Sequence, residues 1–289
     1  MLCCPSRRGR IVAVSLLPNV DALAAEIPDG ALVALPPDYA GVSVAATRAL
    51  VRRGARGLRL VSVPQSGLQA DVLIGAGCVA AVETAAITMG ELGPAPRFTA
   101  AVKAGTIAIK DSTCPAIHAA LQASEKGLPF MPLRGLIGTD VLRHRADWRV
   151  IDNPLAQGAD PIVLLPALKP DVGLFHAPLA DREGNVWIGR RRELATIAHA
   201  AARSFATVER VIDGSLLDDE RTAAGVLPAL YVSGIAVAER GAWPMALAEH
   251  YDADGAELAR YVAAAATEAG FAAWLAAWLE GGPQRAAAE

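Results

Sequence analysis

Short apolar runs alternate with helix-forming segments along the chain, and no other property of the sequence limits its fold so narrowly. Residues 31–35 are apolar throughout, as is typical of a strand buried on both faces. Residues 44–53 have apolar positions at helical spacing and end in two arginines, which Gly54 follows, and residues 58–63 form the next strand. This alternation predicts an α/β fold with an open, mostly parallel sheet flanked by helices.

The domain organisation is predicted to be simple. No linker rich in Ser, Pro or Gly interrupts residues 11–280, and no repeat of fixed period occurs there. We expect one α/β domain over that range, a disordered N-terminal tail over 1–10 and a C-terminal tail over 281–289. Residues 71–77 are predicted to form a strand that runs into a glycine turn, and residues 256–280 an amphipathic helix.

Composition and charge exclude several classes of function. The mean hydropathy of +0.32 is high, but no apolar run approaches the roughly 18 residues of a membrane span. The net charge of −3 and scattered cations argue against a nucleic-acid or anionic-membrane partner. The four cysteines, Cys3, Cys4, Cys78 and Cys114, form no metal-binding or disulfide pattern. We therefore expect a soluble, cytoplasmic protein with reduced thiols and without a metal site.

The stretch over residues 101–140 is the strongest candidate for a functional site. A short strand over residues 106–109 precedes Lys110, Asp111 and Ser112, and a helix follows to about Lys126. Ligands of open α/β sheets bind at the carboxyl ends of strands, where helix N-termini and loop amides converge. Asp111 is thus a candidate base or orienting group. The alternative is helix capping, which Ser112 or Thr113 can also perform.

An ordered series of motifs carries a resemblance to a known family. The series is GLPF-x-P-x-RG-x-x-GTD over 127–140, then KPDV over 169–172, His176-Ala177, and ADREGNV over 180–186. It resembles the A subunit of family I coenzyme A (CoA) transferases, and the glutaconate CoA-transferase type most closely. The resemblance covers roughly residues 31–279. It implies the CoA-transferase family I fold, a separate B subunit, and an active site between the two subunits.

The resemblance also implies a division of labour. In the family, a glutamate of the B subunit, in a Ser-Glu-Asn-Gly-type loop, forms an acyl anhydride and then a CoA thioester. The present sequence has no such loop: Glu83 lies in sequence predicted to be helical, and Glu183 lies in a predicted turn. We therefore expect an A subunit that moves CoA from an acyl-CoA to a carboxylate only with its B subunit. The CoA thioester would be a substrate, and no permanently bound cofactor is expected.

Two other functions remain open. The same A-subunit fold occurs in hydrolases that open a carbon ring of a cyclic acyl-CoA during steroid degradation. There, an acidic residue at the position of Asp111 is functional, although both groups usually carry Glu where this chain has Asp. The third possibility is a non-catalytic acyl-CoA-binding protein.

Ser112 is also a substrate-binding candidate, and the remaining ones follow from the same motifs. Arg134 has a planar fork for a substrate carboxylate or a CoA phosphate, or it forms an ion pair, for example with Asp140. His176 follows an apolar strand, where a lone histidine is usually a hydrogen-bonded structural residue. The loop around Arg134 offers close backbone approach and polar groups through Gly135, Gly138, Thr139 and Asp140.

Overall fold

The computed structural model describes residues 14–281, and its core is one large sheet of ten strands. The main path runs in the order β1-β15-β13-β11-β2-β3-β5-β7, and every pair along it is parallel. The predicted open parallel sheet is therefore confirmed. The strands of this sheet are β1 (Ser15–Leu16), β2 (Leu32–Leu35), β3 (Leu58–Ser62), β5 (Val79–Thr84), β7 (Ala108–Asp111), β11 (Val172–Asp181), β12 (Val186–Trp187), β13 (Arg203–Ile212), β14 (Val226–Leu227) and β15 (Gly234–Val237).

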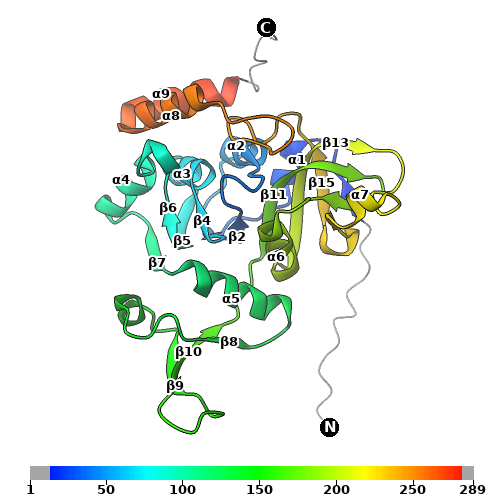
Figure 1. Cartoon of the computed structure of the whole chain (residues 1–289). Helices are drawn as coiled ribbons and strands as arrows, with labels where there is room; N and C mark the ends of the chain where they lie inside the picture. Colours follow the sequence, from blue (N-terminus) through cyan, green and yellow to red (C-terminus); the bar gives the residue numbers. More distant parts are fainter. Residues whose placement is uncertain (1–13, 282–289) are drawn as a thin grey trace.

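Helices cover both faces of this sheet (Figure 1). Along β2 and β3, neighbouring side chains enter different cores, as the alternation of a strand requires: Leu60 joins one core and Val61 the other. The first core includes residues of α1, α2, α3, α8 and α9, and the second includes residues of α5 and α6. The helices are α1 (Val20–Ala25), α2 (Val44–Arg52), α3 (Leu68–Gly75), α4 (Pro96–Ala104), α5 (Cys114–Glu125), α6 (Arg192–Ala200), α7 (Glu220–Ala223), α8 (Gly255–Ala265) and α9 (Glu268–Glu280).

The direction of the strand order changes at β2. From β2 the chain proceeds through β3 and β5 to β7 on one side, whereas β11, β13 and β15 extend the sheet on the other side. Such a switch point opens a crevice at the carboxyl ends of the strands, which is where ligands bind in open α/β sheets. Here the loop after β2 is tied to β11, because the amide of His176 donates to the carbonyl of Gly41 (2.7 Å).

A second, smaller sheet projects from the body beyond α5 (Figure 1). It consists of β8 (Phe130–Leu133), β10 (Pro161–Pro166) and β9 (Arg149–Asp152), which pair antiparallel with β10 in the centre. Val163 and Leu165 of β10 pack against Ala116 and Ala119 of α5 and form a third core. The helix α5 also contributes Ile117 and Leu121 to the core that it shares with α6. It therefore belongs to two cores at once.

Three local predictions are wrong. Residues 71–77 belong to the helix α3 and the turn after it rather than to a strand, because every residue from Leu68 to Ile74 is buried and no amphipathic period remains. Glu83 lies on β5, within the parallel sheet, rather than on a helix. The segment 256–280 forms two helices, because Thr267 interrupts it and caps α9 through a hydrogen bond from the amide of Gly270 (3.1 Å).

The C-terminal helix pair docks on the body of the protein. Trp274 packs edge-on against Tyr261, with ring centroids 4.6 Å apart, and stacks on Trp278 at 5.2 Å. The Arg48 guanidinium of α2 lies over the Trp278 ring at 4.7 Å. In the part of the chain that the structure describes, no helix is long and apolar enough to cross a membrane. The predicted N-terminal tail and residues 282–289 of the C-terminal tail lie outside the described residues.

Candidate functional site

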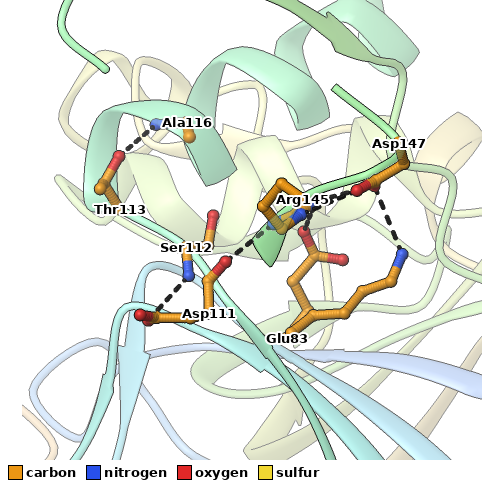
Figure 2. Close-up of polar contacts among 8 residues, drawn as sticks. Glu83, Asp111, Ser112, Thr113, Ala116, Arg145 and Asp147 are labelled. Carbon is orange, nitrogen blue, oxygen red and sulfur yellow. Dashed lines mark hydrogen bonds and ion pairs between the residues drawn. The ribbon is translucent and has the colours of Figure 1, made fainter. Parts of the chain in front are cut away.

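Asp111 ends the strand β7, which is an edge strand of the main sheet, and its side chain is exposed. One carboxylate oxygen accepts a hydrogen bond from the amide of Ser112 (3.0 Å). Of the two possible caps of α5, the structure uses Thr113, whose hydroxyl accepts from the amide of Ala116 (3.3 Å) (Figure 2). The Ser112 hydroxyl is buried and has no hydrogen-bond partner among the described residues. Asp111 and the free Ser112 hydroxyl thus lie directly before the N-terminus of α5.

A buried arginine fixes the backbone at this strand end (Figure 2). Arg145, which is only 4% exposed, donates to the carbonyl of Asp111 (3.0 Å) and to the Glu83 carboxylate (2.8 Å). It also forms a bidentate ion pair with Asp147, in which both N–O distances are 2.9 Å. Its guanidinium lies 3.9 Å from the centroid of the Trp148 ring. Arg145 therefore locks the end of β7, and with it Asp111, to the segment that leads into the small sheet.

The second predicted loop forms no cluster with Asp111 in the structure. Arg134 forms a bidentate ion pair with Asp160 and not with Asp140. Asp140 pairs with Arg143 at 2.9 Å, and both side chains are highly exposed. Gly135 and Gly138 have open space around them, although Gly138 has a φ of +82° that favours glycine. Thr139 donates to the carbonyl of Leu136 (2.8 Å), as in a local turn.

His176 lies at the switch point, and its ring is completely buried. Its Nε2 lies 2.8 Å from the Glu209 carboxylate, and its Nδ1 lies 2.8 Å from the Thr207 hydroxyl. Burial lowers the pKa of His176, so the ring is neutral at pH 7. An anionic Glu209 assigns the single proton to Nε2, and Nδ1 then accepts from Thr207. Both ring nitrogens of His176 have partners within the protein, and this arrangement holds Glu209 in place.

The Glu209 carboxylate accepts four hydrogen bonds. Besides His176, the Tyr251 hydroxyl (2.8 Å) and the amides of Arg240 (2.7 Å) and Gly241 (3.3 Å) donate to its two oxygens. Burial alone would raise the pKa of Glu209, but the hydrogen bonds from His176, from Tyr251 and from the amide of Arg240 outweigh it and lower that pKa. The carboxylate is therefore a stable anion, with three donors on Oε1 and one on Oε2.

An apolar cavity of about 330 Å³ lies where β2, β3 and β5 end. Met89, Met245 and Ala253 line it together with the polar residues Asp38 and Ser66. The Ser66 hydroxyl is buried and has no partner among the described residues. Burial raises the pKa of Asp38 to about 6, although the amides of Gly67 and Leu68 donate to its carboxylate. The cavity thus combines an apolar wall with one free hydroxyl and one carboxyl group that protonates readily.

Tyr39 lies between this cavity and the helix α6. It lines the cavity, and its side chain is 59% exposed. Partial burial raises the pKa of Tyr39, as does the nearby charge of Glu193 in the first turn of α6. Glu193 and Tyr39 line an adjoining cavity together, so the N-terminus of α6 faces the same crevice as Tyr39.

Sequence reasoning missed the residues that organise this site. Arg145 and Glu83 are 62 positions apart, and Glu209 and Tyr251 are 42 apart, so no local motif joins them. The one usable signal was position, since Glu209 lies near the carboxyl end of an apolar strand as Asp111 does. Among residues 14–281, no group of three or more potential ligands forms a metal site.

The fold defines a class: open, parallel α/β proteins, a class in which ligands bind at the carboxyl ends of the strands. The coenzyme A transferase model matches residues 19–238. The chain belongs to this family, and it is similar to the A subunits of family I.

Relatives agree with this assignment. The A subunit of 3-oxoadipate CoA-transferase of Pseudomonas knackmussii is 28% identical over 92% of this chain and 94% of its own length. The IpdA subunit of the cholesterol ring-cleaving hydrolase of Rhodococcus jostii is 28% identical over 64% of this chain and 65% of that protein. The chain spans only 59% of the length of a 30% identical protein of Archaeoglobus fulgidus, which covers 91% of this chain.

Two solved structures share the fold. Glutaconate CoA-transferase from Acidaminococcus fermentans matches with a TM-score of 0.83 and 25% identity, covering 90% of this chain and 87% of that one. A variant of the decarboxylase AibA/AibB matches with a TM-score of 0.82 and 29% identity, covering 94% of this chain and all of the matched one.

Proposed function

We propose that this chain is the A subunit of a CoA transferase that moves CoA from an acyl-CoA to a carboxylate acceptor. The nucleophilic glutamate would come from a separate B subunit. The observation that carries the proposal is the state of the two glutamates near the strand ends: Glu83 is ion-paired with the buried Arg145, and Glu209 accepts four hydrogen bonds. Such partners stabilise a carboxylate anion and weaken its attack on a thioester, so we assign the nucleophile to the partner subunit.

The apolar cavity between Ser66 and Met245 suits the acyl group of the substrate. Its apolar wall would take the carbon chain, and the free Ser66 hydroxyl would donate to a carbonyl or carboxylate oxygen. Asp111, at the exposed end of β7, would be the base or the orienting group of the shared active site. The Ser112 hydroxyl is a free donor at that strand end.

The B subunit would dock on the edge of the main sheet and on the small sheet. The strand β7 ends the main sheet path, so one of its edges is unpaired among the described residues, and Ile109 on it is exposed. The outward face of the small sheet is also apolar and uncovered, with Phe130 and Ile151 exposed by 44% and 38%. Exposed apolar groups on an edge strand and an adjacent sheet face mark a protein interface.

The proposal is tested by reconstitution. The chain is purified alone and together with the product of the neighbouring gene, and CoA transfer from an acyl-CoA to a free carboxylic acid is followed by chromatography. We expect transfer by the complex and none by the chain alone. Robust transfer by the lone chain would contradict the two-subunit proposal.

A ring-opening hydrolase is the second candidate, and the similarity to IpdA together with the exposed Asp111 carboxylate favours it. In that case Asp111 would act on water or on the substrate itself. Asp111→Asn should then abolish carbon-carbon bond cleavage in the complex. Cleavage at the full rate by this variant would exclude the hydrolase. Binding of CoA thioesters without turnover would leave a non-catalytic acyl-CoA-binding protein.

The two described cysteines, Cys78 and Cys114, are free thiols. This state fits the cytoplasmic location that we propose for the complex, because disulfides are rare there.

A further inference from the structure

Three consecutive arginines surround a cavity of about 430 Å³ at the start of α6. Arg190, Arg191 and Arg192 line it together with Gly189, Ala195 and Gly225. Every other lining side chain is apolar, so no acidic residue of the described chain lines this cavity. A concave surface with three guanidinium groups and no lining carboxylate is built to receive a negatively charged ligand.

The charges of these arginines are largely uncompensated. Arg190 approaches the Glu249 carboxylate only to 3.7 Å, and its side chain is 96% exposed. Arg191 is half-buried and donates to the carbonyls of Ile188 (3.1 Å) and Ala248 (3.2 Å), which bear no net charge. Arg192 forms no ion pair among the described residues. Most exposed arginines of the described chain that form ion pairs have an acidic partner within 3.5 Å, so this cluster stands apart.

The backbone reinforces the preference for an anion. Arg191 is the N-cap residue of α6, and its side chain makes no capping hydrogen bond. The positive end of the α6 dipole therefore points toward the cavity, and the N-cap side chain accepts no hydrogen bond from the first amides of the helix. Trp187 adds a further donor beside the wall, because its indole Nε1 is buried, has no partner among the described residues and lies close to Gly225. The carboxylate of Glu193 lines the adjoining cavity next to Tyr39 instead.

The arginine cavity adjoins the crevice through a third cavity. A cavity of about 290 Å³ lies between the two, and it shares Gly189, Arg190 and Arg191 with the arginine cavity. It also shares Tyr39 with the apolar cavity that contains Ser66. The three cavities therefore follow one another along the surface, and a long, narrow ligand laid across them would place its apolar end near Ser66 and its anionic end near Arg192.

We propose that the Arg190–Arg192 cavity binds the phosphates of the 3′-phosphoadenosine diphosphate part of CoA. The pantetheine arm would run past Tyr39 and deliver the acyl thioester to the apolar cavity. This assignment rests on the proposed function, because it takes CoA to be the substrate. Guanidinium forks bind phosphate oxygens in pairs, and several phosphates on one ligand match several arginines.

Calorimetric titration of the full-length chain with CoA, dephospho-CoA and pantetheine tests the assignment. We expect CoA to bind at least tenfold more tightly than dephospho-CoA, and pantetheine to bind most weakly. The double variant Arg190→Gln/Arg192→Gln should weaken CoA binding by about tenfold or more and leave pantetheine binding unchanged, since each lost charged hydrogen bond is worth about tenfold. Raising the salt concentration should weaken CoA binding to the wild type more than to the variant.

The control is Arg52→Gln, which makes the same kind of substitution once, at the far end of α2. Arg52 is half-exposed, pairs with Asp21, and lines none of the three cavities. The Arg52→Gln variant should bind CoA with the same affinity as the wild type. Circular dichroism of each variant confirms that the fold is intact.

Equal affinity of the wild type and the double variant for CoA would overturn the site, as would equal affinity for CoA and pantetheine. These results are separable from the proposed function. Arginine-dependent CoA binding by a chain whose complex shows no CoA transfer would retain the site and reject the transferase. If the complex transfers CoA and the double variant has the same KM for acyl-CoA as the wild type, the site is rejected and the transferase is retained.

Discussion

Arg145 is the residue on which the candidate site depends most. It is buried among Glu83, Asp147 and the carbonyl of Asp111, so its loss leaves a carboxylate and a carbonyl without their donor. Arg145→Met should destabilise the protein by about 3 kcal/mol, because an unpaired buried charge is costly. Urea unfolding measures this change. Arg143→Met, which removes an exposed arginine paired with the exposed Asp140, should cost less than about 0.5 kcal/mol.

Asp147 makes the same cluster sensitive to acid. The hydrogen bonds from Arg145 lower the pKa of Asp147 to about 2, below its ordinary value of 3.8. A carboxyl group whose pKa is lower in the folded state stabilises the protein above pH 3.8, and this contribution disappears as the pH falls toward 2. Asp147→Asn should therefore reduce the free energy of unfolding at about pH 6, by about 1 kcal/mol given its partial exposure, and have little effect near about pH 2. An equal loss at both pH values would contradict this prediction.

Part of the site was predictable from single residues, and part was not. Asp111 was found because a strand and a helix flank it in the sequence, which is local information. Glu83 and Arg145 are 62 positions apart, and only the folded chain brings them together. Arg134 was predicted from a motif to bind a ligand or pair with Asp140, but its partner is Asp160, at a distance of 26 positions. The local sequence shows which chemical groups a side chain carries, but it does not show which distant residue becomes its partner in the fold.

At the scale of elements, the contact between the loop after β2 and the strand β11 positions the crevice. Gly41 has a φ of +90°, and a Cβ atom built on it would lie 2.3 Å from the carbonyl oxygen of His176. Gly41→Ala should therefore destabilise the protein by about 3 kcal/mol or more, because both the backbone and the contact are strained. Gly54→Ala has a similar φ of +70° but open space, so it should cost only about 1 kcal/mol. Thermal unfolding of the two variants separates steric conflict from backbone strain.

The helices and strands were predictable where the spacing of apolar residues in the sequence showed the period of a helix or a strand. The strands β2 and β3 and the helix α2 appeared as apolar runs and as helical spacing, and the structure confirms each of them. The helix α3 was not recognised, because it is buried from Leu68 to Ile74 and shows no polar face. The break at Thr267 was missed for another reason: alanines continue the apolar pattern of α8 into α9, and capping alone separates the two helices.

At the scale of the whole molecule, the exposed face of the small sheet predicts a specific loss of assembly. Phe130→Ser/Ile151→Ser should weaken association with the B-type subunit by at least about tenfold and leave the stability of the lone chain nearly unchanged, because both residues are already exposed. Sedimentation velocity of the mixed proteins measures the association. Leu155→Ser is the matched control, because Leu155 is 91% exposed and lies outside the strands of the small sheet. Association equal to that of the wild type in the double variant would place the interface elsewhere.

The helix α5 has a consequence for how the chain unfolds. Ile117 and Leu121 anchor one side of α5 in the core shared with α6, whereas Ala116 and Ala119 close the core of the small sheet. The small sheet therefore cannot lose its packing without exposing a helix that the large sheet also needs. We expect the two sheets to melt in one cooperative transition, and amide hydrogens of β10 to exchange with solvent as slowly as those of α5. A projection that looks like an appendage thus shares the folding equilibrium of the body.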